Sequence, residues 1–110
     1  MPLSGKARVE VYVPDLPSPS YRALLQAFER EFAFTLGGCT TIRSLEGSYL
    51  SRLGAIVRDR VNVIYADAPF PVEENFGTLS RYTEELKAAA FEALEEEAVL
   101  VTVSEVYRAE

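Results

Sequence analysis

The chain has 110 residues, close to the commonest size of a single domain, so we expect one domain over residues 1–110 with one core. Apolar residues make up 48% of the sequence and charged residues 25%, a balance that is ordinary for a globular protein and excludes a disordered chain. The formal net charge of −6 would repel a phosphate backbone, so we expect no nucleic-acid partner.

The apolar runs are much shorter than the ~20 residues that a helix needs to cross a bilayer, so we expect no membrane partner. The opening residues, Met1 to Lys6, lack the apolar stretch of a secretory signal. The single cysteine, Cys39, cannot form an internal disulfide and suits a reducing compartment. We therefore expect a soluble, cytoplasmic protein.

The residue types that are missing limit the chemistry. The sequence has no histidine, which is the usual general base near neutral pH and the commonest metal ligand. One cysteine cannot supply the several thiolates of a structural zinc site. Neighbouring glutamates such as Glu84 and Glu85 do not face each other on a helix, so they make a poor acid–base pair. We expect Cys39 to be a small buried side chain, and we expect no catalytic residue, no metal and no cofactor.

The first predicted element is a strand over residues 7–13, where apolar and polar side chains alternate strictly. Prolines then interrupt the pattern, and Ser18 before Pro19 is typical of a helix start. A helix follows, with one apolar face made by Tyr21, Leu24, Leu25, Phe28 and Phe32. Gly37 and Gly38 end it, since glycine readily adopts the left-handed conformation of a helix C-terminus.

Residues 39–43 predict a second strand, because they are rich in β-branched side chains. Residues 44–59 predict an extended, bulged or partly mobile hairpin arm, and residues 61–66 predict a third strand. A second helix is expected from about Leu79 to Glu97 after an N-cap at Thr78. Its inward face would be made by Leu79, Tyr82, Leu86, Ala90, Ala93 and Leu94. Residues 99–107 predict the last strand.

This order of elements predicts an α+β fold of the ferredoxin-like kind, a β-α-β-β-α-β sandwich with an antiparallel sheet and both helices on one face. The first and third strands would be central, and the other sheet face would lack helices. Arg8, Glu10 and Tyr12 would share that open face with Leu100, Thr102, Ser104 and Val106. Because such faces are commonly buried by a second subunit or used to bind a ligand, we expect a homo-oligomer through this face. The alternatives are a solvated face and a ligand pocket in a monomer.

The segment 37–54 combines glycines, hydroxyl side chains and arginines, and residues 40–60 carry four arginines against two acids. Backbone amides at glycines and arginine side chains can bind an anion, so the segment is a candidate site for a small anionic ligand. The candidate ligand-binding residues are Tyr12, Thr40, Arg43, Tyr49 and Arg58. The alternative is that the glycines serve turns and bulges and that the arginines pair with the acidic second helix.

The middle third of the chain carries a spaced pattern, Gly38-x-Thr40, Gly47-x-Tyr49, Gly54 and Arg58-Asp59, that leads into a strand. This pattern resembles a family of small bacterial ferredoxin-like proteins of unknown function, which carry Gly-x-Thr, Gly-x-Trp, Gly and then an acidic residue. Tyr49 stands where that family has tryptophan. The resemblance implies no activity.

The element order, the Gly38-Cys39-Thr40 start of the second strand and the long connection to the third strand also resemble the PII-like signalling proteins. That resemblance implies a trimer that binds nucleotides or small anions at subunit clefts through this connection. The chain lacks the Lys/Gln-Gly residues of the PII loop, and its last strand offers only Arg108 where those proteins have several basic groups.

We therefore expect a non-enzymatic, self-associating domain that binds a small ligand or a protein partner, such as a PII-like sensor or regulator. The alternative is a small enzyme of the dimeric ferredoxin-like kind, with a pocket between helices and sheet. A deep apolar pocket joining Tyr49 to the sheet face would favour the enzyme. A flat apolar interface without a cavity would favour the binding domain.

Overall fold

A computed structural model of the chain describes residues 2–94 and 99–109, with the side chain of Tyr49 outside that description. The elements are β1 (Leu3–Pro14), α1 (Pro19–Leu36), β2 (Thr40–Leu50), β3 (Ile56–Asp67), α2 (Phe76–Leu94) and β4 (Leu100–Ala109). The predicted ferredoxin-like α+β architecture is confirmed. Within the described ranges no helix is long and apolar enough to cross a membrane.

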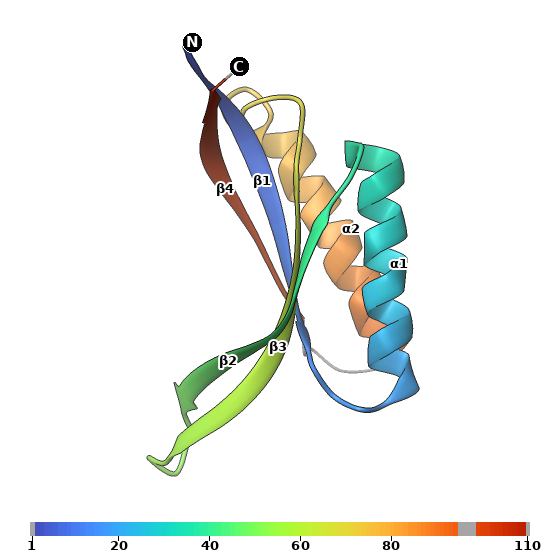
Figure 1. The fold of residues 1–110 in the computed structure, drawn as a ribbon, viewed down its shortest axis with the longest axis vertical. Coiled ribbons are helices and arrows are strands. Elements are labelled where there is room, and N and C mark those ends of the chain that lie inside the picture. The colour runs from blue at the N-terminus through green and yellow to red at the C-terminus, as the bar shows by residue number, and fades with distance from the viewer. Residues whose placement is uncertain (1, 95–98, 110) are drawn as a thin grey trace.

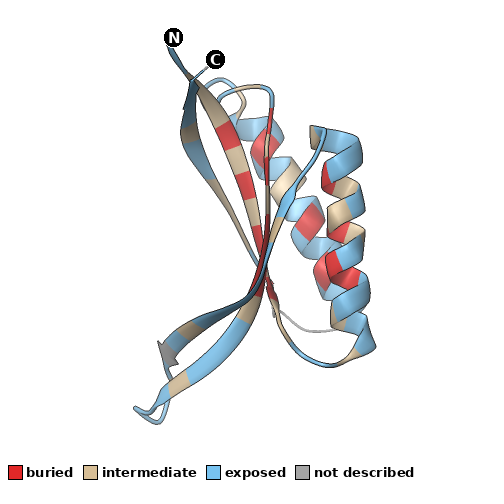
Figure 2. Cartoon of the chain, in the orientation of Figure 1, coloured by how far each residue is buried: buried red, intermediate tan, exposed pale blue. Residues whose placement is uncertain are grey.

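The four strands form one antiparallel sheet in the order β2-β3-β1-β4, so β1 and β3 are central as predicted. Both helices pack on the same side of this sheet, as Figure 1 shows. The strict alternation of β1 puts Val9, Val11 and Val13 against the helices, where each is fully buried. This alternation of buried and partly buried residues is visible along β1 in Figure 2.

The helices close the core with the apolar faces that their spacing predicts. The buried helix residues are Leu24, Leu25, Phe28 and Phe32 on α1 and Leu79, Leu86 and Ala90 on α2. Tyr82 and Leu94 pack partly buried against this core. Ala93 is exposed, so its prediction as an inward residue is wrong. Its neighbour Leu94, at the end of α2, still packs against the core.

The helix ends differ from their predicted chemistry. Ser18 precedes α1 in an extended conformation, but its side chain makes no capping hydrogen bond. Its carbonyl instead accepts the N–H of Tyr21 at 3.1 Å. Helix α2 begins at Phe76 rather than after Thr78, because the carbonyl of Asn75 accepts the N–H of Leu79 at 2.9 Å. The predicted continuation of this helix through residues 95–97 lies outside the described residues.

Strands β2 and β3 form the extended, bulged hairpin that the sequence predicts for residues 44–59. Pairing runs from Thr40 with Tyr65 to Leu50 with Ile56, and the register shifts between Ile42 and Leu45. Strand β2 therefore continues well past the predicted end at residue 43. The far end of the hairpin swings away from the helices, as Figure 1 shows, and the molecule is elongated at 47 × 27 × 24 Å.

Candidate functional site

The open sheet face carries a paired polar cluster near its centre. The register places Arg8 between Asp67 on β3 and Ser104 on β4. The Arg8 guanidinium donates to the Asp67 carboxylate at 2.7 and 3.1 Å, and its Cζ lies 4.3 Å from the centre of the Tyr65 ring. The hydrogen bond to Asp67 raises the pKa of Arg8. The Arg8 guanidinium is thus bound by side chains of the neighbouring strand β3.

Tyr12 lies four residues after Arg8 on β1, on the same face. Its hydroxyl donates to Oε2 of Glu10 at 3.3 Å. Burial, followed by the charge of Glu10, raises the pKa of Tyr12, so the phenol stays protonated at neutral pH. Tyr12 can offer a hydrogen bond or an apolar ring to a partner, but it is poorly placed to act as a base.

An apolar row crosses the open face from one sheet edge to the other. Leu100 pairs with Tyr12, Tyr12 with Val63, and Val63 with Ile42, so one side chain from each strand lies in this row. Leu100 is 56% exposed at one end of the row and Ile42 is 41% exposed at the other, whereas Val63 between them is only 4% exposed. The predicted sharing of this face by β1 and β4 is confirmed by the same register.

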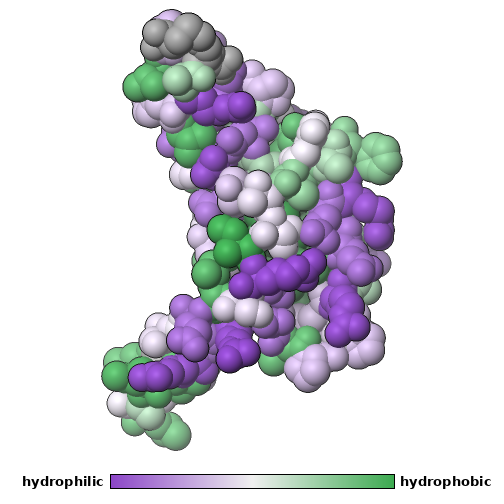
Figure 3. Space-filling model, in the orientation of Figure 1, coloured by the Kyte–Doolittle hydropathy of each residue, from purple (hydrophilic) through white to green (hydrophobic). Residues whose placement is uncertain are grey.

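Exposed apolar side chains continue along the hairpin. The large ones are Ile42, Leu45, Leu50, Leu53 and Ile56, and Leu53 at the tip is 95% exposed. Figure 3 shows hydrophobic side chains gathered at the far end of the hairpin, beyond the body of the molecule. The register places Leu45, opposite Val61, on the face of Ile42, and it places Leu50 and Ile56 on the other face of the hairpin. Exposed apolar side chains gathered in this way are typical of a region that another chain covers.

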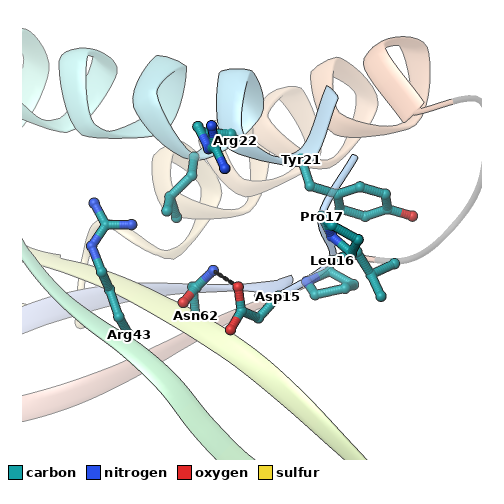
Figure 4. Close-up of a pocket in the computed structure, with 9 residues that line it drawn as sticks. Asp15, Leu16, Pro17, Tyr21, Arg22, Arg43 and Asn62 are labelled. Atoms are coloured by element: carbon teal, nitrogen blue, oxygen red, sulfur yellow. Dashed lines mark hydrogen bonds between the residues drawn. The ribbon is translucent and has the colours of Figure 1, made fainter. Parts of the chain in front are cut away.

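A separate pocket of ≈ 270 Å³ lies on the helix side of the sheet, where the loop after β1 meets α1 and β2. Its polar lining residues are Asp15, Arg22, Arg43 and Asn62, and its apolar lining residues are Pro14, Leu16, Pro17, Tyr21 and Leu25. Figure 4 shows Arg22 on α1 and Arg43 rising from β2, with Asp15 and Asn62 joined by a hydrogen bond below them. We call this cavity the bulge pocket.

The register shift in β2 builds the floor of the bulge pocket. Ser44 adopts a left-handed backbone with φ 57°, which is uncommon for a residue other than glycine. Its N–H donates to Oδ1 of Asn62 at 2.9 Å, and its hydroxyl donates to Oδ2 of Asp15 at 2.7 Å. A β-bulge commonly redirects side chains near functional sites, and here it leaves Arg43 in the lining of the pocket.

Asp15 is held in its ionised form by these contacts. The Ser44 hydrogen bond is the largest cause that lowers the pKa of Asp15, and the Asn62 amide adds to it by donating to Oδ1 at 3.4 Å. Asn62 is 7% exposed and is the one buried polar side chain among the described residues. A buried amide needs partners, so the pairing of Asn62 with Ser44 and Asp15 orders all three groups.

The structure places the five predicted ligand residues in separate regions. Tyr12 lies on the open sheet face, and Thr40 lines a shallow depression of ≈ 420 Å³ at the other end of β2. Arg43 lines the bulge pocket, and Arg58 lines an open depression of ≈ 280 Å³ further along the hairpin. Tyr49 pairs with Val57 through its backbone, and its side chain lies outside the described part of the chain.

Sequence reasoning missed three residues of the bulge pocket. Asn62 left a usable signal, since it is a lone amide inside the apolar strand segment 61–66. Asp15 left a weaker one, as a carboxylate within a proline-rich turn. Arg22 left none, because an arginine in the first turns of an amphipathic helix is ordinary surface chemistry.

Two expectations about individual side chains are corrected. Cys39 is exposed just before β2, so its prediction as a buried side chain is wrong. Desolvation, followed by the charge of Glu29, raises the pKa of its thiol, which makes it a poor nucleophile. Arg43 approaches Glu29 of α1 at 3.9 Å, whereas the sequence suggested partners on the second helix. No three acidic or cysteine side chains of the described residues are grouped as a metal ion would require.

Comparison with solved structures supports the fold. A phage SAM lyase in complex with S-methyl-5′-thioadenosine is 18% identical, with a TM-score of 0.58 over 96% of this chain and 85% of that chain. CutA1 from Oryza sativa is 14% identical, with a TM-score of 0.53 over 98% of this chain and 85% of CutA1. A PII-like protein from Thiomonas intermedia K12, bound to ADP, AMP and acetate, is 16% identical. Its TM-score is 0.51 over 100% of this chain and 94% of the PII-like protein.

These identities support a shared fold and nothing finer. The resemblance to PII-like proteins is therefore supported at the level of the fold, while nothing found matches the small bacterial family. No protein-family profile matches the chain, and no curated protein sequence matches it.

Proposed function

We propose that this protein is a self-associating domain that binds a small ligand through an anionic group of that ligand, without catalysing a reaction on it. The observation that carries the proposal is the apolar row across the open sheet face, with Leu100 56% exposed at its edge. Fully burying an aliphatic side chain of this kind contributes about 1.5–3 kcal/mol. Several such side chains on each of two subunits can together offset an association cost of roughly 4–15 kcal/mol.

The hairpin supports a second copy of this chain as the partner. Its exposed apolar residues project beyond the body of the molecule, where they can reach a neighbouring subunit (Figure 3). Ile42 and Leu45 lie on the face of the apolar row, so the row extends onto the first part of the hairpin. A symmetric assembly of identical chains could bury both surfaces at once.

Ligand binding is supported by charge and by proteins of similar fold. Arg22 and Arg43 place two guanidinium groups in the lining of one pocket. Small ligands occupy proteins with this fold, since the PII-like protein is bound to ADP, AMP and acetate and the phage SAM lyase to S-methyl-5′-thioadenosine. The raised pKa values of Tyr12 and Cys39 keep both groups protonated at neutral pH, so neither is set up to act as a base or a nucleophile.

Sedimentation velocity of charge variants tests the self-association. Wild-type protein at about 100 µM should sediment as an oligomer, because a specific interface should have a Kd well below that concentration. Replacing Ile42 and Leu100 by lysine should give monomers that keep the wild-type circular dichroism spectrum. The matched control is Phe34→Lys, which charges an 89% exposed residue on α1 and should leave the oligomer intact. A monomeric wild-type protein would overturn the proposal.

A further inference from the structure

The geometry points to the bulge pocket as a binding site for a free α-amino acid with an apolar side chain. In this arrangement the ligand's carboxylate lies between Arg22 and Arg43, and its ammonium group faces Asp15. The inference rests on the proposed small-ligand function and names the ligand class. It does not depend on self-association, because the pocket lies on the helix side of the sheet.

Both arginines can accept a carboxylate. They enter the pocket from different elements, Arg22 from α1 and Arg43 from β2, as Figure 4 shows. The ion pair of Arg43 with Glu29 is long at 3.9 Å, and the Arg43 side chain is 62% exposed. An exposed pair of this kind contributes little, so a ligand carboxylate can replace it. Guanidinium groups bind carboxylates through paired hydrogen bonds, which fixes the ligand's orientation.

Asp15 decides the class of ligand. It is the only acidic side chain in the described lining of the pocket, and its lowered pKa keeps it charged at neutral pH. Ser44 and Asn62 hold one carboxylate oxygen each. A carboxylate has about four acceptor positions, so capacity remains for an ammonium group. A phosphate or other dianion would meet like charge at Asp15, whereas a zwitterion places opposite charge at both ends.

The size and the apolar wall of the pocket complete the match. The volume of ≈ 270 Å³ lies below the range of about 300–1,000 Å³ that is usual for drug-sized ligands, so the ligand must be small. Leu16, Pro17, Tyr21 and Leu25 line the wall and can cover a branched or aromatic side chain. The left-handed Ser44 keeps Asp15 and Asn62 in place, as strained residues often do at ligand sites.

Isothermal titration with three related probes tests the inference. L-Leucine carries both charges, 4-methylpentanoate lacks the ammonium group, and isopentylamine lacks the carboxylate. We expect L-leucine to bind wild-type protein at least about tenfold more tightly than either analogue, because each loses a charged hydrogen-bonding partner. Tighter or equal binding of 4-methylpentanoate or of inorganic phosphate would show a simple anion site and overturn the inference. Failure of all probes to bind would overturn it as well.

Single substitutions separate the two ends of the ligand. Arg22→Gln and Arg43→Gln should each weaken L-leucine and 4-methylpentanoate at least about tenfold. Asp15→Asn should weaken L-leucine and isopentylamine while leaving 4-methylpentanoate unchanged or tighter. Arg30→Gln changes an exposed arginine of α1 outside the pocket and serves as the matched control. Uniform effects on all three probes, with folding verified by circular dichroism, would contradict the assigned orientation.

Sedimentation of the same samples keeps the two proposals distinguishable. Oligomeric protein that binds none of the probes refutes the amino-acid site and leaves self-association standing. Monomeric protein that binds L-leucine with the expected variant pattern refutes self-association and supports the site.

Discussion

Two phenylalanines of α1 have opposite environments, although they lie six positions apart on one helix. Phe28 is 3% exposed in the core, whereas Phe34 is 89% exposed. We expect Phe28→Ala to lower the free energy of unfolding by about 3–5 kcal/mol, because it leaves a cavity beside Leu24, Leu25 and Phe32. Phe34→Ala should change it by no more than about 0.5 kcal/mol. Urea denaturation of both variants checks this. Equal urea midpoints for the two variants would show that Phe28 does not contribute to the core.

Asp15 makes stability depend on pH in a defined direction. Its folded-state pKa lies below the ordinary value of 3.8, so the ionised form favours folding. This contribution is present above the unfolded-state pKa and is lost as the pH falls through the lower folded-state pKa. Melting temperatures measured from about pH 5 down to about pH 2 should therefore fall less steeply in Asp15→Asn than in wild-type protein. Ser44→Ala removes the hydrogen bond that contributes most to lowering the pKa of Asp15, so its melting temperature should also fall less steeply with pH than that of wild-type protein. Parallel curves for all three proteins would contradict the assignment.

The residue-level chemistry of the bulge pocket was only partly predictable. Arg43 was identified from its place in a glycine- and arginine-rich segment, but its partners Asp15 and Asn62 lie far from it in the sequence. They come together only because the register of β2 shifts between Ile42 and Leu45. No periodicity in residues 40–50 indicates where that shift falls. Cys39 was misjudged for a similar reason, since burial at a sheet edge depends on what lies beyond the edge.

At the scale of elements, the regular patterns predicted the structure well. The alternation of residues 7–13 and the helical spacing from Tyr21 to Phe32 each depend on one local period, and both are confirmed. Boundaries were less predictable, because they depend on single hydrogen bonds. Helix α2 begins where the Asn75 carbonyl receives the Leu79 N–H, and a Thr78 cap looks equally good in sequence.

The outer hairpin is predicted to serve association rather than folding. None of residues 50–57 belongs to the buried core. Ser48 pairs with Arg58, so replacing residues 49–57 by an Asn-Gly turn leaves a two-residue hairpin. We expect the shortened protein to keep the wild-type circular dichroism spectrum but to sediment as a monomer or a weaker oligomer. Loss of folding would show that the outer hairpin has a structural role. An unchanged oligomer would show that the outer hairpin does not take part in the interface.

At the scale of the whole molecule, the two proposed functions use opposite sides of one sheet. The apolar row and the Arg8–Asp67 pair lie on the open face, and the bulge pocket lies among β2, β3 and α1 on the helix face. Asn62 and Val63 are neighbours in β3, yet the alternation of the strand sends one to the pocket and the other to the apolar row. A subunit can therefore assemble through one face while its pocket stays open on the other.

Native mass spectrometry of freshly purified protein at about 100 µM tests self-association and ligand binding together, because it reports both assembly and retained ligands. One subunit has a mass of 12.2 kDa. We expect ions at a fixed multiple of that mass, with a small-molecule adduct that is lost on mild activation. A spectrum that contains only the bare 12.2 kDa subunit would contradict it.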